Sequence, residues 1–488
     1  MKERLDALMS YGIERGLFAI SETSLVQDRL IAIFDLPKWT FTRRYDLPDL
    51  DAILKPILNY AENNNLYEPK TLAERDAFEA LVMDAMMPSP NAVKARFRKL
   101  FAHDPNRATR MLYDLSIAVN YIKSKRLEKN RSWTHLSRYG TLQMTINLAK
   151  PEKDPKDIAK ARLKTENRVE GRPKCPLCKE NERNYHNARM NLRIVPIELG
   201  GETWHFQYSP YLYYHEHAII LSDEHRPMAI TGRTFVYLFD FLDLFPDYFI
   251  GSNADLPIVG GSILNHDHFQ GGKHPFPIEK ASALGTFDDG QVKVEHLYWP
   301  LATIRLTSTN RLLLTEYAEA FLDYWRGYDN PSLGIVSHTG DVAHNTVTPI
   351  ARKKGHAYQL DIILRNNRTT DEYPEGIFHP HADVQHIKKE NIGLIEAMGL
   401  AILPGRLESE LRMILRALRN RERNLSAQLA RHAHWYEGLR VRRTTWTLED
   451  LLDEVGKKFV SVLEDAGVFK FDQGGISAMH RLIETVLY

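Results

Sequence analysis

The chain has 488 residues, of which 43% are apolar and 26% are charged, which is typical of a globular protein with a sizeable core in two or three domains. Its formal net charge of +1 argues against a general polyanion-binding protein, and no stretch approaches the ~20 apolar residues that span a bilayer. The amino terminus lacks the uninterrupted apolar segment of a secretory signal. We therefore expect a cytoplasmic protein with no membrane or nucleic-acid partner.

Residues 1 to about 130 carry apolar residues at helical spacing, for example in "LDAILKPILNYAE" (50–62) and "ERDAFEALVMDAMM" (74–87). Ser89 before Pro90 predicts the start of a further helix, because serine is a common N-cap and proline fits the first turn. The polar, lysine-rich stretch 150–174 then resembles a connection to the next region.

From about 175 to 405 the pattern changes to short strand-like runs that glycine, proline and asparagine interrupt. These runs are "HAIILS" (217–222), "LPIVGGSIL" (256–264), "ATIRLTST" (302–309) and "YQLDIILRN" (358–366). They indicate an α/β or α+β fold. The arginine-rich segment 408–435 then predicts a long helix, whose arginines we interpret as a solvated face rather than as a phosphate-binding stripe.

Histidines recur in pairs two residues apart. The pairs are His215/His217, His266/His268, His379/His381 and His432/His434. Side chains two apart in a strand point to the same side, so a pair can share a task, but we interpret the first pair as structural and the last as surface. "HDHFQ" (266–270) and "HPHADVQ" (379–385) resemble each other, which hints at a duplicated unit.

The stretch "GGSILNHDHFQGG" (260–272) is the strongest candidate site, because its glycines let backbone amides approach a ligand closely. His268 could act as a nucleophile, a general base or a metal ligand. Gln270 has no useful acid–base chemistry, but its amide can donate hydrogen bonds to phosphoryl oxygens. A sugar phosphate leaves phosphorus without protonation of the bridging oxygen, so this pair favours phosphoryl-type transfer over hydrolysis.

Cys175 and Cys178 are the only cysteines, so no disulfide network organises the fold. A C-x-x-C can be a redox pair or half of a zinc site, and the absence of a clear preceding strand favours zinc. Two histidines would have to complete a tetrahedral site, and His225 and His266 are the candidates. Such a metal would be structural and would leave His268 free.

The H-x-H-x-Q pattern after a glycine-rich strand end resembles the galactose-1-phosphate uridylyltransferase branch of the histidine-triad superfamily, in which glutamine replaces the third histidine of the hydrolases. "CPLC", "LSDEH" and "NHDHFQGG" also occur in that family's order. Most of the chain resembles the second, bacterial class of UDP-glucose–hexose-1-phosphate uridylyltransferases. The segments that carry this resemblance are "INLAKPEKDPK", "CPLCKEN", "EHRPM", "GGSILNHDHFQGG", "HNTVTPIAR" and "NIGLIEAMGLAILPGRL".

The resemblance implies an α+β fold with a histidine-triad-like antiparallel-sheet core in two related halves, flanked by helical regions. The expected regions are 1–165 (helical), 166–404 (core, with halves of about 166–285 and 286–404) and 405–488 (helical). It also implies a homodimer.

The implied reaction moves uridylyl from UDP-glucose to galactose 1-phosphate by a ping-pong route in which His268 carries the uridylyl group. By the same resemblance Gln270 would hold the phosphoryl oxygens. The implied substrate contacts are Gly261, Ser262 and Asn265, and the implied zinc ligands are Cys175, Cys178, His225 and His266.

The chain also departs from the first class of the family. Asp267 replaces a proline between the two histidines, and the spacing from Ser262 to His266 is one residue longer. Residues 205–211 are the candidate uridine-binding segment. Residues 378–386 could be the second half's counterpart of a further metal site, but we expect no bound metal there. Two other functions remain open: a nucleotide hydrolase of the histidine-triad type and a zinc-bearing RNA-binding protein.

Overall fold

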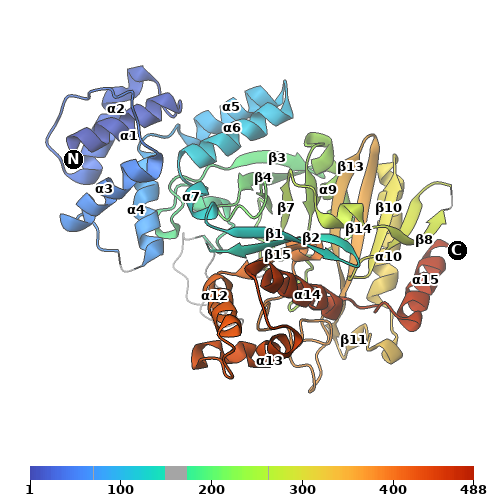
Figure 1. Cartoon of the computed structure of the whole chain (residues 1–488). Helices are drawn as coiled ribbons and strands as arrows, with labels where there is room; N and C mark the ends of the chain where they lie inside the picture. The colour runs from blue at the N-terminus through green and yellow to red at the C-terminus, as the bar shows by residue number, and fades with distance from the viewer. Residues whose placement is uncertain (70, 149–172, 262, 289) are drawn as a thin grey trace. The chain divides into compact units, whose positions relative to one another are not determined.

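The structure is a computed structural model that describes residues 1–69, 71–148, 173–261, 263–288 and 290–488. Ser262 and almost all of the lysine-rich stretch 150–174 therefore lie outside the described residues. The α+β prediction with an antiparallel-sheet core is confirmed (Figure 1).

The chain forms two compact units. Each unit consists of several segments, which alternate along the sequence with segments of the other unit. The first unit comprises the described residues of 1–128, 168–212 and 216–225. The second comprises the described residues of 129–167, 213–215 and 226–488.

Helices make up the amino-terminal part of the first unit, as the apolar spacing predicts. They are α1 (Lys2–Glu14), α2 (Thr23–Phe34), α3 (Leu50–Asn63), α4 (Leu72–Asp84), α5 (Pro90–Phe101), α6 (Pro105–Ala118) and α7 (Ser124–Leu127), with a short 3-10 helix, η1 (Ile20–Glu22). Helix α5 begins where expected, because the Ser89 hydroxyl accepts a hydrogen bond from the amide of Ala92 at 3.3 Å. The Thr71 hydroxyl caps α4 by accepting from the Glu74 amide.

Three antiparallel strands complete the first unit: β3 (Val195–Leu199), β4 (Glu202–Tyr208) and β5 (Ala218–Ser222). Two 3-10 turns, η3 (Lys179–Asn181) and η4 (Tyr185–Asn187), precede them. The strand predicted at 217–222 is thus confirmed from Ala218 to Ser222. The pairing of β4 with β5 sets Trp204 opposite Ser222, close to the segment that leads to His225.

The second unit contains an antiparallel sheet in which the neighbours follow the order β7-β6-β13-β14-β10-β9-β8. The strands are β6 (Phe249–Gly251), β7 (His268–Gly272), β8 (Ala283–Asp288), β9 (Lys293–Leu297), β10 (Thr303–Ser308), β13 (Asn345–Lys354) and β14 (Ala357–Asn366). The predictions of strands at 302–309 and 358–366 are confirmed by β10 and β14.

One face of this sheet packs against α9 (Gly232–Leu244) and α10 (Arg311–Arg326) (Figure 1). The registers place Phe249, Ile350 and Ile363 together on the opposite face, because directly paired strand residues point the same way. The remaining elements are η5 (Pro277–Lys280), η6 (Pro331–Leu333), β11 (His338–Thr339), β12 (Val342–Ala343), α11 (Leu394–Ala397), α12 (Arg406–Arg419), η7 (Ala427–His432), α13 (Ala433–Arg442), α14 (Leu448–Ala466) and α15 (Gln473–Leu487).

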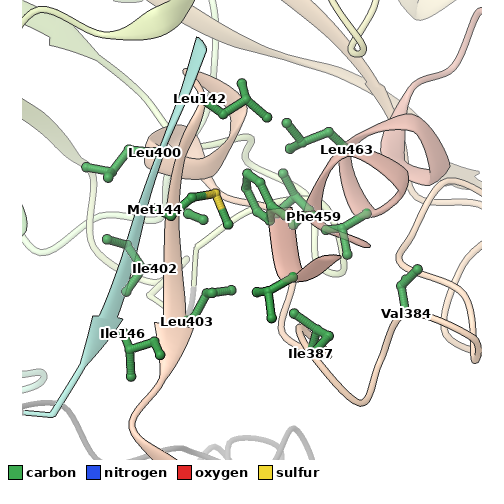
Figure 2. Close-up of a cluster of buried hydrophobic side chains, with 14 of the residues drawn as sticks. Leu142, Met144, Ile146, Val384, Ile387, Leu400, Ile402, Leu403, Phe459 and Leu463 are labelled. Carbon is green, nitrogen blue, oxygen red and sulfur yellow. The ribbon is translucent and has the colours of Figure 1, made fainter. Parts of the chain in front are cut away.

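A second, three-stranded sheet joins β1 (Arg131–Ser137), β2 (Gly140–Asn147) and β15 (Leu400–Pro404). Strand β15 runs parallel to β2, although the two are far apart in sequence. Their apolar side chains meet α14 in the main core of the unit, as Figure 2 shows. The labelled members are Leu142, Met144, Ile146, Val384, Ile387, Leu400, Ile402, Leu403, Phe459 and Leu463.

Two predicted elements are wrong. The run 256–264 is not a strand over its described residues: Gly260 makes an isolated bridge to Ala254, and Ile258 has a φ of 73°, so the chain turns there. The predicted long helix at 408–435 breaks after α12, where Arg421 takes a left-handed φ of 55°. Among the residues that the structure describes, no helix has the length and apolar character needed to cross a membrane.

Candidate functional site

The C-x-x-C loop brings three of the predicted metal ligands together within the first unit. Cys175 and Cys178 are both buried and form no disulfide, and their Sγ atoms lie 3.6 Å apart. Nδ1 of His225 lies 3.2 Å from the Cys178 Sγ. A tetrahedral zinc centre with Zn–S bonds of about 2.3 Å separates two thiolates by roughly 3.8 Å. The spacing of the sulfur atoms therefore fits such a centre and is far too long for a disulfide.

Backbone amides already face the sulfur atoms. The Leu177 amide donates to the Cys175 Sγ at 3.4 Å, and the Cys175 amide donates to the Cys178 Sγ at 3.3 Å. A hydrogen bond with the Cys178 sulfur and burial raise the pKa of the Cys175 thiol well above its usual value. A bound cation would remove that proton, because a coordinating thiol is deprotonated outright.

His266 is the fourth predicted ligand. Cys175, Cys178, His225 and His266 form a group that could hold a metal ion, with one ligand atom of each within 4.8 Å of the others. Within the second unit, the Asp267 amide, next to His266, donates to the carbonyl of Arg226 at 2.8 Å. Two sulfurs and two imidazoles are the donor set of a structural zinc site.

His268 is the first residue of β7 and is buried, with an exposed fraction of 6%. Its Nδ1 lies 2.8 Å from the carbonyl oxygen of His266. A carbonyl can only accept, so Nδ1 carries the proton and Nε2 carries the lone pair. Burial lowers the pKa of His268 to about 4, which keeps the ring neutral near pH 7. The neutral ring therefore carries its lone pair on Nε2.

Gln270 and His268 share one face of β7, because they are two residues apart in a strand. Gln270 pairs with Gly251 of β6, and Gly251 pairs with Ile350 of β13. Both side chains therefore lie on the face of the sheet that carries Ile350, opposite the face that α9 and α10 cover. His266 precedes the strand, so the shared-face argument does not apply to the pair His266/His268, contrary to the sequence-based expectation.

The predicted substrate contacts have different positions. Gly261 lies against Asn253, whose Nδ2 would stand 2.8 Å from a Cβ added to the glycine. Asn265 is exposed. The buried Asn253 was missed by the sequence analysis, although its Oδ1 accepts from the amide of Leu394 at 2.9 Å and thereby joins segments 141 residues apart. A contact at that separation leaves no local sequence signal.

Two further histidine pairs lie outside the strands. His215 and His217 lie in the turn before β5 rather than in a strand. In the loop after β14, Nδ1 and Nε2 of His379 lie within hydrogen-bonding distance of the Pro380 carbonyl and the Asn391 side chain, and Nε2 of His381 donates to the Ile377 carbonyl. The candidate second metal site at 378–386 thus has its histidine rings engaged by protein groups.

The interpretation of the pair His432/His434 as surface is wrong for His432. That side chain is completely buried, with Nε2 3.0 Å from the Glu410 carboxylate and Nδ1 2.8 Å from Nδ1 of His386. These two partners satisfy the ring and explain why it can be buried. In the candidate uridine-binding segment 205–211, His205 donates through Nε2 to Asp223 at 2.6 Å.

Two protein-family models match the chain. The model "Galactose-1-phosphate uridyl transferase, N-terminal domain" matches residues 29–227, and the model for the C-terminal domain of the same family matches residues 241–436.

Full-length relatives agree. A galactose-1-phosphate uridylyltransferase of Clostridium acetobutylicum is 45% identical over 499 residues, which cover 99% of this chain and 99% of the relative. One of Bacillus subtilis is 44% identical over 503 residues, which cover 99% of this chain and 97% of the relative. A solved structure of yeast Ap4A phosphorylase Apa2 with Ap4A is 13% identical and covers 62% of this chain and 90% of that chain; its TM-score of 0.35 is too low to bear on the function.

Proposed function

Because this chain belongs to the galactose-1-phosphate uridylyltransferase family and carries that family's activity in galactose metabolism, we propose that it transfers uridylyl through His268. The donor is UDP-glucose and the acceptor is galactose 1-phosphate. The observation that carries the proposal is the hydrogen bond from Nδ1 of His268 to the His266 carbonyl, which presents Nε2 as a lone pair.

In the first half-reaction Nε2 attacks the α-phosphorus of UDP-glucose. A P–N bond forms, the bond from that phosphorus to the bridging oxygen breaks, and glucose 1-phosphate leaves with the electron pair. In the second half-reaction a phosphate oxygen of galactose 1-phosphate attacks the same phosphorus, and the electron pair of the P–N bond returns to Nε2. Each transfer is thus split into two displacements that share one pocket.

The His266 carbonyl does more than fix the tautomer. When Nε2 bonds to phosphorus, positive charge develops on the imidazole ring, and the Nδ1–H···O hydrogen bond of 2.8 Å becomes charge-assisted. The carbonyl is in place before the reaction, so this stabilisation requires no reorganisation. Gln270, on the same face of β7, donates hydrogen bonds to the phosphoryl oxygens, and Gly261, Ser262 and Asn265 are the further substrate contacts of the proposal.

Zinc is the proposed metal of the group formed by Cys175, Cys178, His225 and His266. The donor set of two sulfurs and two nitrogens supports zinc, as do the hydrogen bonds from backbone amides to the sulfurs. When bound, zinc supplies no chemistry to the transfer and holds the segments that carry its ligands. A cytoplasmic location is part of the proposal, because two buried cysteines that form no disulfide suit a reducing compartment.

The test is incubation with UDP-glucose labelled on the α-phosphate, followed by denaturation and peptide mapping. The wild type should retain label on the peptide that contains His268. The variant His268→Ala should retain none and should lose turnover by on the order of 10⁴-fold or more, because a nucleophile acts as a unit with its site.

His434→Ala is the matched control, because His434 is an exposed histidine. It should keep both label and turnover. Label on His268→Ala, or wild-type release of free UMP without retained label, would contradict the proposal; the second outcome would indicate hydrolysis.

A further inference from the structure

We propose that Asn181 and Asp223 are positioning residues that set the metal ligands Cys175, Cys178 and His225 in place and thereby slow metal release. The inference rests on the metal role proposed above and names residues outside the ligand group. Both residues and these three ligands lie in the first unit.

Asn181 shapes the C-x-x-C loop from inside. Its side chain is 1% exposed, and its Nδ2 donates two hydrogen bonds, to the Cys175 carbonyl at 2.8 Å and to the Cys178 carbonyl at 2.9 Å. Its Oδ1 accepts from Nδ2 of Asn187 at 2.6 Å, which fixes the amide orientation. One planar NH₂ group therefore ties together the backbones of both cysteines.

The asparagine amide supplies both the two donors and the acceptor that this position uses. An aspartate of the same shape has no donor and would set a carboxylate against two carbonyl oxygens. An apolar residue would leave both carbonyls without the donor. The separation of 3.6 Å between the two Sγ atoms thus depends on a group that touches neither sulfur.

Asp223 connects the C-x-x-C loop to the segment that carries the ligand His225. Its Oδ1 accepts from Nζ of Lys179 at 2.5 Å and from Nε2 of His205 at 2.6 Å. Lys179 follows Cys178 directly, and Asp223 precedes His225 by two residues. This carboxylate therefore links the Cys178 end of the loop, strand β4 and the approach to His225.

The two contributions differ in size. Asn181 is buried, whereas the side chains of Lys179 and Asp223 are 39% and 42% exposed. Water and salt weaken the exposed pair, so its effect on the ligands is small. Residues that orient metal ligands typically change metal affinity by about 10- to 100-fold, and we assign that range to Asn181 and a change of a few-fold to Asp223.

The test measures zinc release from the purified holoenzyme into an excess of a colorimetric chelator. Asn181→Asp should release zinc about 10- to 100-fold faster than the wild type, and Asp223→Asn a few-fold faster. Cys175→Ser, which removes a ligand, marks the upper limit of the effect.

Asn345→Asp is the matched control. Asn345 is also buried, its Nδ2 donates to two carbonyls, of Trp325 at 2.7 Å and Tyr328 at 2.9 Å, and its Oδ1 accepts from Asn366. Asn345→Asp should lower the unfolding temperature as Asn181→Asp does but should leave the zinc release rate at the wild-type value.

Equal release rates in Asn181→Asp and the wild type would overturn the inference, as would equal acceleration by both asparagine variants. If Asn181→Asp fails to fold, wild-type release from Asp223→Asn would overturn it. A stable wild type without stoichiometric zinc would instead overturn the proposed metal role, so the two failures are distinguishable.

Discussion

Asp361 is completely buried and binds two arginines at once. Nε and Nη2 of Arg305 lie 2.6 and 2.9 Å from its two carboxylate oxygens, and Nη1 of Arg352 lies 2.7 Å from one of them. Burial raises the pKa of the Asp361 carboxyl, but the charges of Arg352 and Arg305 outweigh burial and hold that pKa below its usual value. The carboxylate is therefore the anion on which two buried cations depend.

Asp361→Asn should destabilise the protein by about 3–5 kcal/mol, because it leaves two buried arginines without their counter-ion. The free energy of unfolding in urea measures the effect. The exposed pair Lys125–Glu128 is the control, and Glu128→Gln should cost less than about 1 kcal/mol.

The same variant has a pH signature. A carboxyl whose pKa is lowered by folding adds stability above the unfolded-state pKa of about 3.9, and this stability is lost as the pH falls. When the pH falls from about 5 to about 3, roughly one unit either side of that pKa, the free energy of unfolding should decrease more for the wild type than for Asp361→Asn. Parallel losses would contradict the assignment.

At the level of residues, the role of His268 as nucleophile stays a prediction. The structure adds the hydrogen bond from its Nδ1 to the His266 carbonyl, which fixes the tautomer. Asn181, Asn253 and Asp361 were missed, because an isolated Asn or Asp carries no periodic signal and its meaning depends on distant partners. His432 was misread for the same reason, since Glu410 and His386 lie elsewhere in the chain.

Strand β2, strand β15 and helix α14 pack together around Phe459, whose side chain has no exposed surface (Figure 2). The alternation of Leu142, Met144 and Ile146 points one face of β2 into this core, and Leu463 extends the apolar stripe of α14 by one turn. This seam, formed by β2, β15 and α14, therefore joins a strand near residue 140 to a strand and a helix from residue 400 onward.

Phe459→Ala should cost about 3–5 kcal/mol, because truncation removes apolar contacts and leaves a cavity that the rigid seam cannot fill. Val441→Ala on α13 is the control: Val441 is 75% exposed, and its loss should stay within about 0.5 kcal/mol. Thermal and urea unfolding would measure both variants. A small loss for Phe459→Ala would indicate that the seam collapses around the missing ring.

Helices with local capping signals were predictable, and pairings over long distances were not. Ser89 and Pro90 mark the start of α5 correctly because the cap is a contact within three residues. The hairpin β1–β2 was missed, although Leu142, Met144 and Ile146 alternate as strand residues do. The predicted strand at 256–264 failed because a short apolar run does not reveal that Ile258 has a positive φ.

At the scale of the whole molecule, both compact units are discontinuous in sequence. Segments around 213–215 and 216–225 alternate between the units, so an analysis that reads the chain in order cannot find these borders. The division into 1–165, 166–404 and 405–488, with a core of two related halves, stays a prediction.

The homodimer is the prediction that belongs to this scale. Size-exclusion chromatography with light scattering should give a molar mass of about twice the 56.4 kDa of one chain, unchanged on dilution through the micromolar range. A mass equal to that of one chain at all concentrations would contradict the dimer and would leave the uridylyl-transfer proposal untouched.

The parallel pairing of β15 with β2 has a consequence for how the protein is made. Residue 404 leaves the ribosome 257 residues after residue 147, which at about 5–20 residues per second takes roughly 13–50 s. During that time β2 can pair with β1, but neither β15 nor the later helix α14 is present to pack beside it. Exposed apolar surface of this kind makes a nascent chain prone to aggregate, so we expect chaperones that cover it during synthesis to raise the yield of folded protein.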